Sequence, residues 1–199
     1  MSQALTYADL ARPSAKRLAL AYDLGLIAVG SLLVALSATV SVRLPFTPVP
    51  WTLQPLAVLL VGALLGARRG MAALLAYLAE GVSGLPVFAE GSFGIAPLLG
   101  PTGGYLVGFV AAAGVTGALA ERGWDRRFLS TWAAMALGSL TLFAFGLAWL
   151  SRFTGWSGVL AAGFWPFVPG DLVKQVLAAL LLPAAWKLAG RARPGSGGP

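Results

Sequence analysis

The sequence predicts an all-α integral membrane protein with six transmembrane helices and both termini in the cytoplasm. Hydrophobic residues make up 58% of its 199 residues and charged residues only 11%, whereas soluble domains carry about 25% charged residues. The charges also fall in short groups between long apolar runs. This length suits one domain, which we expect at residues 1–190, followed by a disordered cytoplasmic tail at residues 191–199.

Six apolar stretches are candidate spans, since a helix needs about 20 apolar residues to cross the hydrocarbon core. The first contains one charge, Asp23; the second and third are short, and Glu80 interrupts the third. A retained first helix is favoured over a signal peptide, because the stretch is long and cleavage would leave five spans. The predicted spans are Leu18–Val42, Thr52–Ala67, Gly70–Gly84, Gly103–Ala120, Phe128–Ser151 and Asp171–Trp186.

The basic residues set the predicted orientation, because cytoplasmic segments are enriched in Lys and Arg. With the N-terminus inside, the external segments hold only Arg43 and Arg152, and Lys174 lies within a span. The other eleven of the fourteen basic residues are then cytoplasmic.

Several function classes are excluded by composition. A pI near 10.6 suits a nucleic-acid binder, but such proteins cluster Lys and Arg on one face, so no nucleic-acid partner is expected. The chain has no Cys and no His. Ser–His relays, metal sites built on these ligands and thiolate catalysis are therefore absent, and we expect neither an enzyme nor a cofactor.

The three predicted external connections are long, apolar and rich in Gly and Pro, unlike the short basic cytoplasmic turns. Thr52 suits a helix N-cap, and Pro55 falls in the first turn that follows. Non-helical backbone at membrane depth is tolerated where it lines a cavity. We therefore infer an outward-facing binding pocket roofed by these connections, which contain Arg43–Trp51, Gly84–Gly94 with Gly100–Tyr105, and Pro166–Asp171.

Asp171 and Lys174 are the strongest candidates for ligand contact. They are three residues apart, so on a helix they share one face. A lysine at the external, positive end of a helix dipole is unfavourably placed unless it has a task. The alternative is that Asp171 is a helix N-cap that Lys174 merely neutralises.

Three other acidic side chains are given simpler interpretations. Asp23, about one turn into the first span, is predicted to snorkel or to pair with Lys16. Glu80 faces either the pocket or the external water, and this choice stays open. Glu90 is predicted to be a solvated side chain in a flexible loop.

Four motifs in the external segments resemble the BioY family, the biotin-binding S components of energy-coupling-factor (ECF) transporters. The likeness covers residues 21–182, and the motifs are specific because all four occur in order. They read LPFTPVP followed by TLQ at residues 44–54, GLPVF at 84–88, GPTGGY at 100–105, and PFVPGDLVK at 166–174.

The resemblance implies an S-component-like six-helix bundle in a bacterial cytoplasmic membrane that captures biotin from outside with high affinity. It implies three partner subunits, one ECF transmembrane subunit and two cytosolic ATPases. Small residues on the first helix, here Ala21 and Gly25, would dock on the transmembrane subunit, although the family motif usually has Ala where this chain has Gly25. The chain itself contains no phosphate-binding Gly-x-x-x-x-Gly-Lys-Ser/Thr motif, so uphill transport needs a partner's ATP hydrolysis or ion coupling.

A biotin site needs an acceptor for the two ureido N–H groups, a donor for the ureido carbonyl, apolar walls, and a cation or N–H for the carboxylate. We assign Asp171 to the ureido N–H groups. Lys174 serves either the ureido carbonyl or the carboxylate. The other candidate ligand-binding residues are Tyr105, Gln54, Phe88, Trp51 and Gly91.

Two alternative functions remain from the sequence. The same architecture can carry another vitamin. The chain can also be a self-sufficient secondary transporter in which Asp171 or Glu80 carries a proton.

Overall fold

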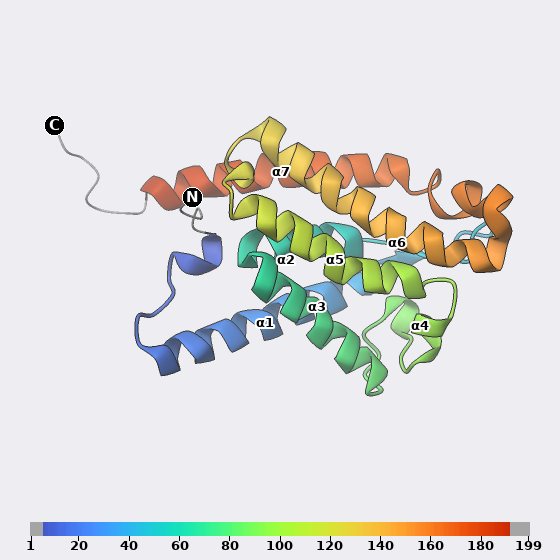
Figure 1. Cartoon of the computed structure of the whole chain (residues 1–199), viewed down its shortest axis with the longest axis horizontal. Helices are drawn as coiled ribbons and strands as arrows, with labels where there is room; N and C mark the ends of the chain where they lie inside the picture. The colour runs from blue at the N-terminus through green and yellow to red at the C-terminus, as the bar shows by residue number, and fades with distance from the viewer. Residues whose placement is uncertain (1–5, 192–199) are drawn as a thin grey trace.

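The computed structural model describes residues 6–191, so the predicted tail lies outside it except for Arg191, which is helical. The elements run along the chain as η1 (Tyr7–Asp9), α1 (Lys16–Ala38), β1 (Ser41–Val42), β2 (Trp51–Thr52), α2 (Gln54–Leu65), α3 (Ala67–Val82), η2 (Ala89–Gly91), α4 (Ala96–Leu99), α5 (Gly103–Ala120), η3 (Trp124–Arg126), α6 (Phe128–Gly163) and α7 (Val168–Arg191). Both ends of the described chain lie at one end of a helical bundle, and α4 lies at the other (Figure 1).

The predicted all-α membrane architecture is confirmed at the level of the helices. Each of the six predicted segments contains a helix, but the first helix ends at Ala38 rather than Val42, because the chain turns there into the β1–β2 pair. Helices α1, α5, α6 and most of α7 are long and apolar enough to cross a membrane. The other two, α2 with 12 residues and α3 with 16, are shorter. At 1.5 Å per residue, α2 is only about 18 Å long. Length and composition alone therefore identify four spans among residues 6–191, and the count of six stays a prediction.

Helix boundaries match the prediction for α5 and differ most for α6. The fifth span was predicted to end at Ser151, but α6 continues to Gly163 and bends at Gly155, where φ is 70° and ψ is 164°. The start of α2 also differs, since Leu53 is its N-cap. Thr52 lies one residue earlier, and its hydroxyl accepts a hydrogen bond from the Gln54 amide at 3.2 Å. Pro55 occupies the first turn as predicted.

Glycine permits close packing at the centre of the bundle, where α2 and α3 meet α5. A Cβ added to Gly62 would lie 2.5 Å from the carbonyl oxygen of Ala113, and one on Gly70 would lie 3.0 Å from Gly62 Cα. Small residues that let backbones approach are typical of helix interfaces in membranes. As a result α5 is the central helix, and 67% of its 18 residues are buried.

Helix α1 is peripheral by the same measure, since only 22% of its most apolar 18 residues are buried. Its outer face is apolar, and Ala21 and Gly25 are both exposed on it. A Cβ built on Gly25 meets nothing within 4 Å. At the inner face, the Ser31 hydroxyl donates to Glu80 of α3 at 2.6 Å. Glu80 therefore faces α1, which answers the question that the sequence left open.

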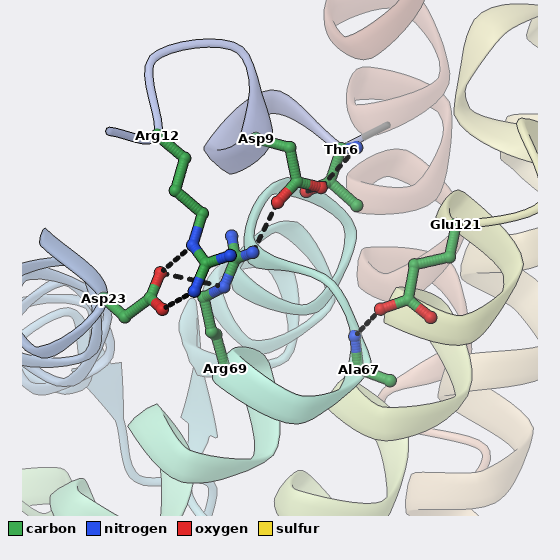
Figure 2. A network of polar contacts seen from close by, with 7 residues as sticks. All are labelled: Thr6, Asp9, Arg12, Asp23, Ala67, Arg69 and Glu121. Atoms are coloured by element: carbon green, nitrogen blue, oxygen red, sulfur yellow. Dashed lines mark hydrogen bonds and ion pairs between the residues drawn. The ribbon is translucent and has the colours of Figure 1, made fainter. Parts of the chain in front are cut away.

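A polar network joins α1 and the N-terminal segment to α3 at the end of the bundle where the termini lie (Figure 2). Asp23 binds Arg12 at 2.7 Å and Arg69 at 3.3 Å, and Arg69 also binds Asp9. The prediction that Asp23 pairs with Lys16 is therefore wrong. Asp23 pairs with Arg12 instead, because the segment before α1 folds back toward the helix. Glu121 adds a cap, accepting a hydrogen bond from the Ala67 amide at the start of α3 at 2.9 Å.

Candidate ligand-binding cavity

A cavity of about 280 Å³ opens among the connecting segments at the α4 end of the bundle. Its wall combines residues from the predicted external segments with residues from α5, α6 and α7. Its lining is mainly apolar, as in most small-molecule sites, and comprises Pro48–Pro50, Thr52, Gln54, Pro55, Phe88–Glu90, Ser92, Ala96, Pro97, Gly100–Thr102, Tyr105, Leu106, Phe109, Leu142, Phe143, Phe167, Asp171 and Lys174.

Asp171 and Lys174 form a buried ion pair in this wall, as their spacing predicts. The Lys174 Nζ lies 3.2 Å from Asp171 Oδ1, and the two residues are 4% and 6% exposed. The Asp171 amide donates to the Phe167 carbonyl at 2.9 Å. Asp171 therefore lies inside the first turn of α7 rather than at an N-cap, so the cap in the alternative interpretation is wrong.

Lys174 is held by contacts from the first connecting segment. Its Nζ donates to the Thr52 carbonyl at 2.8 Å and lies 4.6 Å from the centroid of the Trp51 ring. Gly170 leaves room for that ring, because an added Cβ would lie 2.8 Å from Trp51 Nε1. An ammonium group has three N–H donors, so one remains beyond the bonds to Thr52 and Asp171.

The second carboxylate oxygen of Asp171, Oδ2, is buried and has no hydrogen-bond partner among the described residues. Buried polar atoms are nearly always paired. An orphaned acceptor in a cavity wall is therefore suited to receive an N–H donor from a ligand.

Gln54 and Phe88 line a neighbouring part of the wall and are held by Tyr77. The Gln54 side-chain amide donates to the Tyr77 hydroxyl at 2.6 Å. Phe88 is 2% exposed and packs edge-on against Tyr77, with ring centroids 5.4 Å apart. Gly81 beneath Phe88 has to be glycine, because an added Cβ would clash with the phenyl ring.

Tyr105 joins α5 to the end of α6. Its hydroxyl donates to the Gly163 carbonyl at 2.8 Å. This bond commits its proton, so a ligand meets the ring of Tyr105 or an oxygen that can only accept. The ring also lies edge-on to Phe143, with centroids 6.4 Å apart.

An ion pair closes the rim between the first and second connecting segments. Glu90, predicted to be a solvated side chain, instead binds Arg43 through both carboxylate oxygens. These hydrogen bonds from Arg43 lower the pKa of Glu90 below its ordinary value. Glu90 also has φ 61°, a left-handed conformation that is uncommon outside glycine.

The structure brings five of the predicted ligand residues into one wall and leaves two outside it. Asp171, Lys174, Tyr105, Gln54 and Phe88 line the cavity. Two residues, Trp51 and Gly91, do not: Trp51 packs on Lys174 from behind, and Gly91 lies in η2, where its neighbours Glu90 and Ser92 face the cavity instead.

Two further aromatic residues that line the cavity, Phe109 and Phe143, are not predicted from the sequence. Both lie in uncharged spans, where a phenylalanine that faces a ligand looks the same as one that faces lipid. No sequence signal distinguishes them without the helix orientation.

The BioY family model matches residues 8–191 of this chain. The biotin transporter BioY of Rhizobium etli is 41% identical over 168 residues, covering 80% of this chain and 90% of that protein. The probable biotin transporter BioY of Pyrococcus horikoshii is 37% identical, covering 81% and 94%. The crystal structure of an S-component for biotin from an ECF-type ABC transporter superposes with a TM-score of 0.74 at 24% identity, covering 88% of this chain and 95% of that one. The fold is therefore that of an S-component, and the chain belongs to the BioY family.

Proposed function

We propose that this chain is the biotin-binding, substrate-specific subunit of an ATP-driven vitamin uptake transporter of the ECF type. The observation that carries the proposal is the unpartnered oxygen of Asp171 in the cavity wall. The names of the relatives, biotin transporters, support it. The chain would work as a transport protein without catalysis or a cofactor of its own.

The wall offers groups that complement each part of biotin. Asp171 Oδ2 accepts from the ureido N–H groups, and the remaining N–H of Lys174 reaches the ureido carbonyl or the carboxylate. Phe88, Phe109 and Phe143 supply apolar surface for the thiophane ring.

The proposed arrangement in the membrane follows the distribution of charge. With both termini in the cytoplasm, the cavity opens to the outside and the polar network of Figure 2 lies at the cytoplasmic face. Six crossings then require that α2 and α3, although short, reach both interfaces with their flanking turns. The proposed location is a bacterial cytoplasmic membrane.

A calorimetric titration of the purified, detergent-solubilised chain with biotin tests the substrate. We expect saturation at one biotin per chain without nucleotide or partner, because every lining residue belongs to this chain. Thiamin and riboflavin are the controls. Binding of either one with no binding of biotin would refute the substrate assignment and leave the fold untouched.

The proposed partners are an ECF transmembrane subunit and two cytosolic ATPases. Uptake of labelled biotin into proteoliposomes tests this, with the chain alone compared to the chain plus such a module and ATP. We expect accumulation only with the module. Accumulation by the chain alone, driven by a pH gradient, would instead indicate a secondary transporter.

A further inference from the structure

A second cavity lies outside the ligand-binding cavity, on the flank of the bundle where α4, α5 and α6 meet. Its volume is about 310 Å³. Arg152 is the one charged residue in its wall. The rest of the lining is apolar or glycine and comprises Leu98, Gly103, Gly104, Val107, Phe145, Ala148 and Trp149.

The base of this groove is firmly built around Trp149. Its indole Nε1 donates to the Gly100 carbonyl at 2.9 Å. Gly104 lets α5 approach α6 closely beside it, because an added Cβ would lie 2.5 Å from the Phe145 carbonyl oxygen. The groove is therefore a fixed feature of the α5–α6 contact.

Arg152 lies at the edge of this groove and has no acidic partner in the part of the chain that the structure describes. Its guanidinium carbon lies 4.7 Å from the centroid of the Trp149 ring, a contact that orients the guanidinium plane. No carboxylate within residues 6–191 lies within ion-pair distance of it. Arg43, at the same end of the molecule, is by contrast neutralised by Glu90.

We propose that this groove binds an anionic glycerophospholipid, with the phosphate on Arg152 and one acyl chain along Val107, Phe145 and Ala148. A guanidinium binds phosphate oxygens through two parallel hydrogen bonds. The groove walls offer apolar surface beside that cation, so an amphiphile with an anionic head complements the site better than free phosphate. The proposal does not depend on which vitamin the chain carries.

Native mass spectrometry of the purified chain, titrated with phosphatidylglycerol or with phosphatidylcholine of the same acyl chains, tests the site. We expect the wild type to bind phosphatidylglycerol preferentially. Arg152→Gln should weaken that binding roughly tenfold, the size of one charge-assisted hydrogen bond. Ala148→Trp, a change at an exposed position on the groove wall, should block the acyl chain while leaving Arg152 in place.

Arg127→Gln is the matched control, since Arg127 is an exposed arginine at the opposite end of α6, and it should bind phosphatidylglycerol like the wild type. Circular dichroism and a monodisperse elution peak establish that each variant folds. Equal binding of the two lipids by the wild type, or unchanged binding by both groove variants, would overturn the proposal. Displacement of phosphatidylglycerol by millimolar inorganic phosphate would overturn it as well, because it would identify the ligand as the free anion.

Discussion

The carboxylate of Asp171 has two oxygens in different states, and this difference defines the site. Oδ1 accepts from Lys174, whereas Oδ2 has no partner among residues 6–191. Leaving a buried acceptor unsatisfied costs about 1–3 kcal/mol. A ligand N–H that reaches Oδ2 recovers this free energy on binding, so the cavity favours a ligand with such a donor.

Asp171→Asn is expected to weaken biotin binding roughly 30-fold or more. The substitution replaces an acceptor oxygen by an NH₂ donor and leaves Lys174 without its counter-charge, and removing one partner of a buried charged pair typically loses ~2–5 kcal/mol of binding. Calorimetry of the purified variant measures the loss. Lys174→Ala should act similarly, and Arg68→Gln, an exposed change far from the cavity, should bind like the wild type. Full affinity in Asp171→Asn would mean that another group meets the ureido ring.

Local spacing predicts contacts of this kind, and long-range packing decides the rest. The Asp171–Lys174 pair follows from two positions on one helix. The contact of Trp51 with Lys174 joins residues far apart in the sequence, and only the fold reveals it. The sequence therefore predicts a functional role for Trp51 but does not predict that its ring contacts Lys174.

At the scale of single elements, the bend in α6 depends on Gly155. Its φ of 70° and ψ of 164° lie in a region that is essentially restricted to glycine. Gly155→Ala should therefore destabilise the chain by about 1–3 kcal/mol, seen as a lower midpoint of thermal unfolding. Gly158→Ala is the matched control, because Gly158 is helical and its added Cβ would meet Thr154 at an ordinary 3.8 Å. The same loss of stability in both variants would contradict this role of Gly155.

The connecting segments are expected to be held over the cavity by the Arg43–Glu90 ion pair. Arg43→Gln should speed the dissociation of biotin roughly two- to fivefold, as expected for an exposed pair. Raising the salt concentration should speed dissociation from the wild type but not from the variant, because salt screens exposed charges. Stopped-flow Trp fluorescence measures the rate. If salt affects both proteins equally, the ion pair does not control the rim.

Element boundaries were predictable where the sequence changes character sharply. The α5 helix begins after Gly100-Pro101-Thr102 and ends before Glu121, so its bounds Gly103–Ala120 follow directly. In α6, Arg152 and Gly155 look like the start of a loop. The helix nevertheless continues because Val159 and Gly163 pack into the core, which is a tertiary effect.

At the scale of the whole molecule, α1 is the least buried of the four long apolar helices. Gly25→Trp and Ala21→Trp add bulk to its exposed face, where Gly25 has open space. We expect both variants to bind biotin normally and to fail in uptake by cells, because a partner helix needs close approach there. Normal uptake by both variants would place the partner on another face.

The polar network of Figure 2 contributes a pH-dependent part of the stability. Burial alone would raise the pKa of Asp9, but hydrogen bonds from Arg69 and Thr6 outweigh it and lower that pKa below its ordinary value. Because folding lowers this pKa, the ionised Asp9 stabilises the folded chain at pH values above the unfolded-state pKa of about 4. That stabilisation is lost as the pH falls through the folded-state pKa. The unfolding temperature of Asp9→Asn should therefore lie below that of the wild type from pH 5 to 7, and the gap should narrow below pH 4. A gap independent of pH would show that the Asp9 charge is not responsible.

The short α2–α3 hairpin also affects how the protein sits in its lipid environment. Helices α2 and α3 have 12 and 16 residues, and α2 contacts α6 and α7, which have 36 and 24. For the six crossings proposed, a hydrocarbon layer of about 30 Å is thicker than α2 and α3 are long and thinner than α6 is long. A short helix is accommodated by local thinning of the bilayer and a long one by tilting, and each response costs fractions of a kcal/mol per Å. The resting tilt of the chain should accordingly vary with the acyl chain length of the membrane around it.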